Sequence, residues 1–153
     1  MIELYDRYSQ ESRDLHESLV ATGLSQLGVV IDADGFLPDG LVSPFTYYLG
    51  YEKGKPLYFN QVPVPAFWEI SGNNQSARIE DMTQERALIH YADGMQARLV
   101  KQVDWKDLEG RVRQVDHYNR FGACFATTTY SADSEEIMTV YQDVNGQEVL
   151  LEN

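Results

Sequence analysis

Asp116, His117 and Cys124 are the residues whose types come closest to a catalytic group, because together they could supply a carboxylate, a base and a thiol nucleophile. A thiol enzyme needs its base within hydrogen-bond reach of the sulfur. Asp116 and His117 are adjacent in a run typical of a β-strand, so their side chains point to opposite faces of a sheet. We therefore interpret Cys124 as a buried structural cysteine and assign no catalytic residue.

Metal and phosphate sites are equally poorly supported. The segment DADGFLPDG (32–40) opens like a calcium loop, but its glycine stands at position four instead of six, and position twelve is Ser43 instead of glutamate. His16 and His90 lie on a presumed helix and strand without ligand spacing. No glycine occurs in YDRYSQES (5–12), where a phosphate-binding turn would follow the first strand. The sequence predicts no metal and no cofactor.

The stretch YFNQVPVPAFWEI (58–70) is the most unusual part of the chain. Its two prolines lack an N–H group, which favours an edge strand or a bend between strands. Its four aromatic residues exceed what one face of a strand can bury, so both core packing and an exposed binding surface remain open. The polar turn SGNNQS (71–76) follows directly. The candidate residues for binding a partner or acceptor are Tyr58, Phe59, Phe67, Trp68, Asn73, Asn74 and Gln75.

The elements that position these residues begin with a strand, a helix and a second strand. Apolar runs at 2–5 and 27–31 enclose a segment that starts with a capping residue, Ser9, and ends at Gly23, which is suited to the left-handed position after a helix. Such a unit normally joins two parallel strands, but it does not complete a doubly wound sheet. We expect the inner face of the helix to carry Tyr8, Ser12, Leu15, Leu19 and Thr22.

From about residue 56 the pattern changes to short β-rich runs separated by Gly, Asp and Asn clusters, which predicts an antiparallel meander and an α+β fold. The turns WKDLEG (105–110) and YQDVNG (141–146) resemble each other. We interpret them as hairpin chemistry, although such patterns also recur in sugar-binding repeats. The expected strands are 57–62, 66–71, 76–81, 86–92, 97–105, 111–118, 123–130, 137–142 and 147–152.

Composition restricts the classes of partner. The chain has 12 Lys and Arg against 24 Asp and Glu, a net charge of -12 that repels phosphate backbones and argues against nucleic acid. Its single cysteine cannot form an internal disulfide. The opening MIELYDRYSQ does not resemble a signal peptide, and no run approaches the roughly 20 apolar residues of a membrane span. We expect a cytoplasmic protein.

Five segments resemble the N-terminal part of the GtfB family, the stabilising subunits of the accessory Sec glycosyltransferase pair. The resemblance implies a GT-B architecture of two Rossmann-like halves, with an antiparallel β-domain inserted into the first half. On that basis residues 1–50 are expected to form a partial Rossmann-like βαβ segment, and residues 51–153 the inserted β-sheet domain. The matching segments are QESRDLHESL, DGFLPDGLVSPFTYYLG, PLYFNQVPVPAFWEISGNNQSARIEDM, RLVKQVDW and YNRFGACFA.

The resemblance further implies a non-catalytic protein that binds a GtfA-like O-GlcNAc transferase and the Ser/Thr-rich adhesin polypeptide that this enzyme modifies. It also implies a complex that is peripheral on the cytoplasmic face of the membrane. Two alternatives stay open. The chain could be the acceptor-binding part of a glycosyltransferase that itself uses UDP-GlcNAc, or it could be a carbohydrate-binding β-module.

Overall fold

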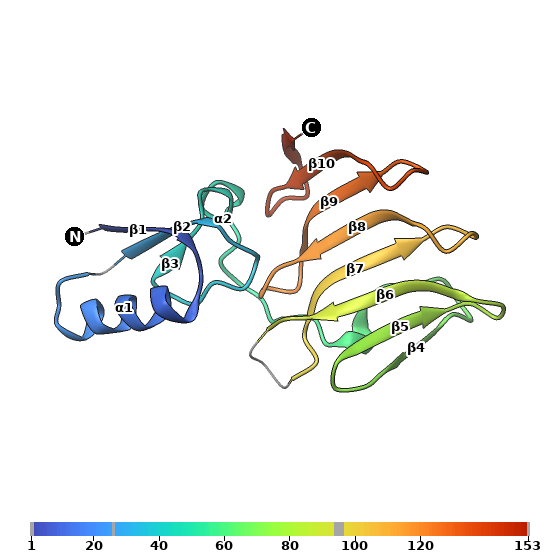
Figure 1. Cartoon of the computed structure of the whole chain (residues 1–153), viewed down its shortest axis with the longest axis horizontal. Coiled ribbons are helices and arrows are strands. Elements are labelled where there is room, and N and C mark those ends of the chain that lie inside the picture. Colours follow the sequence, from blue (N-terminus) through green and yellow to red (C-terminus); the bar gives the residue numbers. More distant parts are fainter. Residues whose placement is uncertain (1, 26, 94–96, 153) are drawn as a thin grey trace.

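The computed structural model describes residues 2–25, 27–93 and 97–152, which form a small N-terminal α/β unit and a large antiparallel sheet (Figure 1). In the N-terminal unit, the described strands are parallel and lie in the order β1-β2-β3. The predicted strand, helix and strand are therefore present, whereas the short strand and helix that follow them were not predicted. The elements are β1 (Ile2–Arg7), α1 (Gln10–Ala21), β2 (Leu27–Asp32), β3 (Leu41–Val42) and α2 (Pro44–Leu49).

Helix α1 begins at its predicted cap. The side chain of Ser9 accepts a hydrogen bond from the Ser12 backbone N–H at 3.2 Å, and Ser12 Oγ accepts one from the Ser9 N–H at 2.7 Å. The prediction that Leu15 faces inward was wrong, since 52% of this residue is exposed. The helix instead buries His16, whose Nδ1 lies 2.5 Å from Glu3 Oε2 on β1. Ser12, a member of the predicted face, is buried as well, so the two buried side chains of the helix are polar where periodicity indicated an apolar contact.

The described residues from 69 onward form an eight-stranded antiparallel meander in which each strand pairs with its neighbour in sequence (Figure 1). This confirms the predicted meander. The expected strand at 57–62 was wrong, because the chain makes only an isolated bridge at Tyr58 and a short 3-10 helix, η1 (Phe59–Gln61). The strands are β4 (Glu69–Gly72), β5 (Ser76–Glu80), β6 (Glu85–Tyr91), β7 (Val100–Lys106), β8 (Val112–Tyr118), β9 (Cys124–Tyr130), β10 (Glu136–Gln142) and β11 (Glu148–Glu152).

Four successive hairpin turns between β7 and β11 share one geometry. In each, a side-chain oxygen accepts hydrogen bonds from the backbone N–H groups two and four residues later. The accepting residues recur every twelve positions: Asp107, Asn119, Ser131 and Asp143. Three residues after each of them stands one with positive φ: Gly110 (82°), Gly122 (79°), Ser134 (64°) and Gly146 (76°). The prediction of hairpin chemistry for 105–110 and 141–146 is confirmed.

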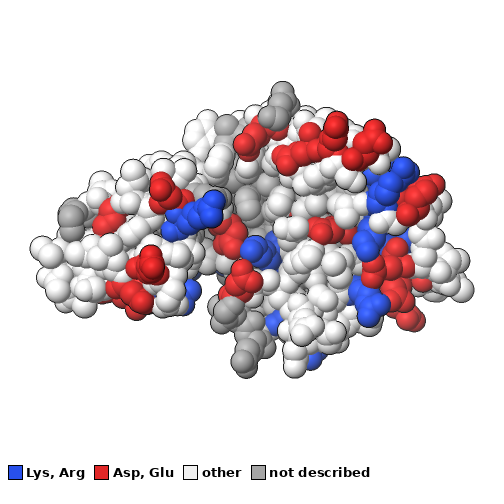
Figure 2. Space-filling model, in the orientation of Figure 1, with Lys and Arg blue, Asp and Glu red and all other residues white. Residues whose placement is uncertain are grey.

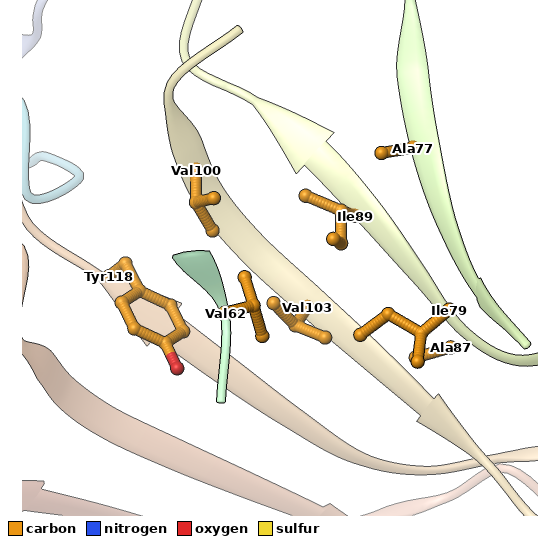
Figure 3. Close-up of a cluster of buried hydrophobic side chains, with 8 residues drawn as sticks. All are labelled: Val62, Ala77, Ile79, Ala87, Ile89, Val100, Val103 and Tyr118. Carbon is orange, nitrogen blue, oxygen red and sulfur yellow. The ribbon is translucent and has the colours of Figure 1, made fainter. Parts of the chain in front are cut away.

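The main core lies on one face of the meander, beneath the segment 57–68 (Figure 3). Val62 points from that segment onto Val103 and its neighbours and is almost fully buried. Leu57, Phe59, Val64 and Trp68 pack against the same cluster. The stretch that composition singled out therefore covers the core. The buried cluster consists of Val62, Ala77, Ile79, Ala87, Ile89, Val100, Val103 and Tyr118.

The N-terminal unit is attached to the turns at one end of the sheet. The Val144 N–H donates to the Leu49 carbonyl at 2.9 Å, and Tyr51 Oη shares its hydrogen between the carbonyls of Gln142 and Asp143, each at 2.9 Å. These hydrogen bonds join the segment after α2 to the turn between β10 and β11.

A second attachment involves the turn between β8 and β9. The Arg120 N–H donates to the Gly35 carbonyl at 2.9 Å. Nearby, the backbones of Gly54 and Gly122 approach so closely that a Cβ on Gly54 would collide with the carbonyl of Phe121, and one on Gly122 with that of Lys55. Glycine is required at both positions because the two chain segments touch backbone to backbone.

Candidate functional site

The aromatic and polar residues predicted as a binding surface fall into two groups. In the first, the rings of Tyr58 and Phe59 lie 4.9 Å apart, and the Arg98 guanidinium lies 5.7 Å from the centre of the Phe59 ring. Arg98 Nη2 also donates to Asn74 Oδ1 at 2.8 Å. Asn73 uses its side-chain oxygen to accept two backbone N–H groups of its own turn. The β4–β5 turn is formed by Asn73, Asn74 and Gln75.

The second group lies around Trp68, whose partly buried side chain packs against the main core. The Arg86 guanidinium lies 4.9 Å from the centre of the Trp68 ring and is held by Asp81 at 3.0 Å. Phe67 is 89% exposed and has a positive φ of 70°. The Asn73 turn and the Asp81 turn stand at opposite ends of β5, so the predicted residues do not form one compact site. Their role in binding stays a prediction.

The structure contains a cleft of about 490 Å³ that sequence reasoning missed. Its floor is the face of β7 to β11 opposite the main core, and its wall is the N-terminal unit around Gly35 and Phe45. The sequence does carry a sign of this cleft. Thr128 and Tyr130 stand at alternate positions of β9, and Thr139 and Tyr141 do so on β10. These hydroxyl-bearing side chains therefore share the face of the sheet that lines the cleft.

A chain of hydrogen bonds crosses the floor of the cleft. His117 Nε2 lies 3.0 Å from Thr128 Oγ1, which lies 2.8 Å from Thr139 Oγ1, and Thr139 in turn donates to Glu136 Oε1 at 3.4 Å. Burial lowers the pKa of His117. The imidazole is therefore neutral at neutral pH, and the floor is polar without carrying positive charge.

Aromatic stacking and a carboxylate define the end of the cleft near β11. Tyr141 donates to Glu152 Oε2 at 3.1 Å, and burial together with this carboxylate raises the pKa of Tyr141 to about 12. Phe45 of α2 stacks on the Tyr141 ring at 4.9 Å with planes only 4° apart. The N-terminal unit and the sheet therefore close this end of the cleft through a rigid ring pair.

Lys101 stands at the other end, near β7. Its Nζ lies 3.4 Å from Asp34 and 3.5 Å from Asp93, so its charge is balanced by two carboxylates. No Lys or Arg follows Arg120 in the sequence, whereas Asp and Glu side chains gather along the β10 and β11 edge of the sheet (Figure 2). The electrostatic setting of the cleft is acidic.

The possible thiol site is not assembled. Asp116 Oδ2 accepts a hydrogen bond from Trp105 Nε1 at 2.9 Å, while His117 faces the cleft. Burial raises the pKa of the Cys124 thiol to about 11, which keeps it unreactive. Within the described ranges, no group of three His, Cys, Asp or Glu side chains could hold a metal ion, and no helix is long and apolar enough to cross a membrane.

Comparison with known proteins places the chain among relatives of one kind. The family model described as the GtfB N-terminal domain matches residues 2–48, and the GtfB middle domain matches residues 68–153. A curated relative from Streptococcus pneumoniae serotype 4 is 92% identical over the whole chain. It is named UDP-N-acetylglucosamine--peptide N-acetylglucosaminyltransferase stabilizing protein GtfB, and the chain spans 34% of its length.

Solved structures agree. A chain in a crystal structure of a GtfA/B complex bound to UDP and GlcNAc is 54% identical, with a TM-score of 0.93 over 100% of this chain and 35% of that one. The pneumococcal O-GlcNAc transferase GtfA, in complex with UDP and GlcNAc, shares the fold at 12% identity, with a TM-score of 0.69 over 99% and 35% of the two chains. The chain thus spans about a third of the relatives it matches, and it belongs to the GtfB family.

Proposed function

We propose that the chain is a non-catalytic binding module of a GtfB-type stabilising subunit. In this role it contacts a GtfA-like O-GlcNAc transferase and the Ser/Thr-rich adhesin polypeptide of the accessory Sec system. The observation that carries the proposal is the 92% identity, across every residue of this chain, to a protein named as a stabilizing protein of a peptide N-acetylglucosaminyltransferase.

The local chemistry supports a module without a nucleotide site. The cationic group of the cleft, Lys101, is already paired with carboxylates, and Glu136 and Glu152 would repel a diphosphate. The N-terminus of α1, where a phosphate often binds, is occupied by the reciprocal hydrogen bonds of Ser9 and Ser12, with Glu11 in the first turn. These features weigh against the alternative that the chain contributes to a UDP-GlcNAc-dependent active site.

We further propose that residues 1–50 begin a Rossmann-like half and that residues 51–153 are the domain inserted into it. Parallel sheets are normally covered on both faces. Here α1 covers one face of β1 and β2, while Ile2 and Leu4 on the other face are 71% and 69% exposed. An apolar face of this kind is what the first strands of a larger layered domain would present.

The same proposal includes contacts between the aromatic stretch and the partner or the acceptor. Tyr58 and Phe67 are the exposed aromatic residues of this stretch. We place the full complex in the cytoplasm, with peripheral attachment to the membrane. A carbohydrate-binding module is the remaining alternative.

Two measurements on the full-length protein test the proposal. Isothermal titration with UDP-GlcNAc should give no binding, and co-expression with the GtfA-like partner should raise the amount of soluble partner. Micromolar binding of UDP-GlcNAc by the isolated subunit would contradict the non-catalytic role. A pull-down that retains only glycosylated acceptor would favour the carbohydrate-binding alternative.

A further inference from the structure

We propose that the cleft between the N-terminal unit and the sheet binds about six residues of an extended, uncharged, hydroxyl-bearing polypeptide. This inference rests on the acceptor-binding role proposed above and assigns that role to a site. The cleft is distinct from the aromatic stretch at 58–70, which lies over the opposite face of the sheet.

The length follows from the strands that the cleft crosses. Its lining runs from Lys101 on β7 to Glu152 on β11, which are four strand spacings apart. At about 4.8 Å per spacing the floor is roughly 19 Å long, and an extended peptide at about 3.3 Å per residue would cover it with about six residues. The volume of about 490 Å³ lies within the range of roughly 300–1,000 Å³ that is usual for ligand sites.

The lining offers groups that recognise neutral polar chains. Tyr130 presents a ring with a hydroxyl group. The Tyr141 hydroxyl donates to Glu152 and Gln102 Nε2 donates to Asp104 Oδ1 at 2.7 Å, so these two side chains offer oxygen atoms that accept hydrogen bonds from backbone amides and from Ser or Thr hydroxyls. Beneath them the hydrogen-bonded pair Thr128 and Thr139 is buried and fixed, so the floor is organised before any ligand arrives.

Charge narrows the choice of occupant. The carboxylates of Glu136 and Glu152 accept hydrogen bonds from hydroxyl and amide groups but repel acidic side chains and phosphates. Lys101 cannot offset this repulsion because Asp34 and Asp93 already pair with it. A neutral Ser/Thr-rich segment meets no such penalty, whereas an acidic or phosphorylated segment does.

The test uses the full-length protein in complex with its GtfA-like partner and a fluorescent, unmodified Ser/Thr-rich peptide of about 20 residues, followed by anisotropy. We expect Tyr130→Ala to weaken binding about tenfold, because it removes an aromatic ring and its hydroxyl group from the cleft lining. Tyr48→Ala, which removes an exposed ring that does not line the cleft, is the comparison and should change binding less than twofold. In a matched pair, Thr128→Val should weaken binding three- to tenfold, while Thr129→Val on the other face of β9 should not.

A second peptide with Asp in place of several Ser residues tests the charge argument. Wild-type protein should bind it at least tenfold more weakly than the neutral peptide, and Glu136→Gln should recover two- to fivefold of that loss. Glu136 is exposed, so this variant is expected to fold even if the floor variants do not.

The outcomes separate the two proposals. If Tyr130→Ala and Thr128→Val bind the peptide as Tyr48→Ala and Thr129→Val do, the cleft is not the site, although the stabilising role stands. If Tyr130→Ala or Thr128→Val no longer binds the GtfA-like partner but still binds the peptide, the cleft is a contact with the partner. That result would also overturn the inference. If the wild-type complex binds neither peptide, the acceptor-binding role fails together with the site.

Discussion

Replacement of Gly122 by alanine probes how firmly the segment 54–57, which follows the N-terminal unit, is held to the β8–β9 turn. Gly110, Gly122 and Gly146 occupy the same left-handed position in three turns of one geometry, with φ of 82°, 79° and 76°. A Cβ on Gly110 or Gly146 would meet nothing within 4 Å, whereas one on Gly122 would strike the carbonyl oxygen of Lys55. The three substitutions therefore share one backbone cost and differ by one steric contact.

The magnitudes follow from these two terms. An alanine in the left-handed region costs about 1–2 kcal/mol, and the lower entropy of its unfolded chain returns about 0.4–1 kcal/mol. We expect Gly110→Ala and Gly146→Ala to lower the free energy of unfolding by about 1 kcal/mol. Gly122→Ala adds an overpacking cost of about 1–3 kcal/mol, because the obstacle is backbone and not a movable side chain, which gives a total of about 2–4 kcal/mol.

Urea denaturation followed by the fluorescence of Trp68 and Trp105, which both pack against the main core, measures the three variants under the same conditions. Gly110→Ala and Gly146→Ala are the matched controls. A Gly122→Ala midpoint equal to that of Gly110→Ala would refute the close seating of the 54–57 segment on the β8–β9 turn. A lower slope for Gly122→Ala alone would indicate a loss of two-state unfolding, as expected if the 54–57 segment detaches before the sheet unfolds.

Three further outcomes are expected. Ser134 occupies the fourth left-handed turn position although it is not glycine. Ser134→Gly should therefore stabilise the chain by about 0.5–1 kcal/mol and raise the melting temperature measured by calorimetry by about 1–4 °C. An unchanged melting temperature would contradict the backbone strain at Ser134. Val62→Ala should cost about 2 kcal/mol in urea denaturation by removing buried methyl groups beneath the segment 57–68, whereas Val64→Ala, at a half-buried position, should cost less. Hydrogen bonds from the Thr83 N–H and its neighbours hold the pKa of Asp81 well below its usual range, so the ionised carboxylate stabilises the fold at neutral pH and this stabilisation is lost as the pH falls below about 4. Asp81→Asn should therefore flatten the acid limb of a plot of unfolding free energy against pH. An unchanged acid limb would contradict the assignment of this pH dependence to Asp81.

The sequence predicted most of the sheet because two local signals coincide there. Alternating side chains define strands such as β9, and turn residues such as Asp107 and Gly110 fix where each strand ends. The expected strand at 57–62 failed because its neighbours Pro63 and Pro65 cannot donate to a ladder, and the segment instead lies across the core. Strand β3 has only two residues and leaves no detectable period.

The cleft could not be predicted for a different reason. Phe45 and Tyr141 are separated by 96 positions in the chain, and only the docking of α2 against β10 brings their rings together. Likewise, Glu3 and His16 form a buried pair because one helix face happens to lie over β1, which a hydrophobic period cannot reveal. Local patterns specify elements, whereas sites between elements depend on how those elements pack.

The neighbour-to-neighbour pairing of β4 to β11 has a consequence for how the chain folds. Each strand closes a short loop onto the preceding one, so the sheet can grow hairpin by hairpin with little loss of chain entropy, as in other domains with local contacts. The N-terminal unit is synthesised before the sheet, and its attachment points on the β8–β9 and β10–β11 turns follow much later in the chain. Until residue 147 has been synthesised, the faces that later meet these turns remain uncovered, so slow elongation through the last two hairpins would prolong the interval in which the nascent chain is prone to aggregate.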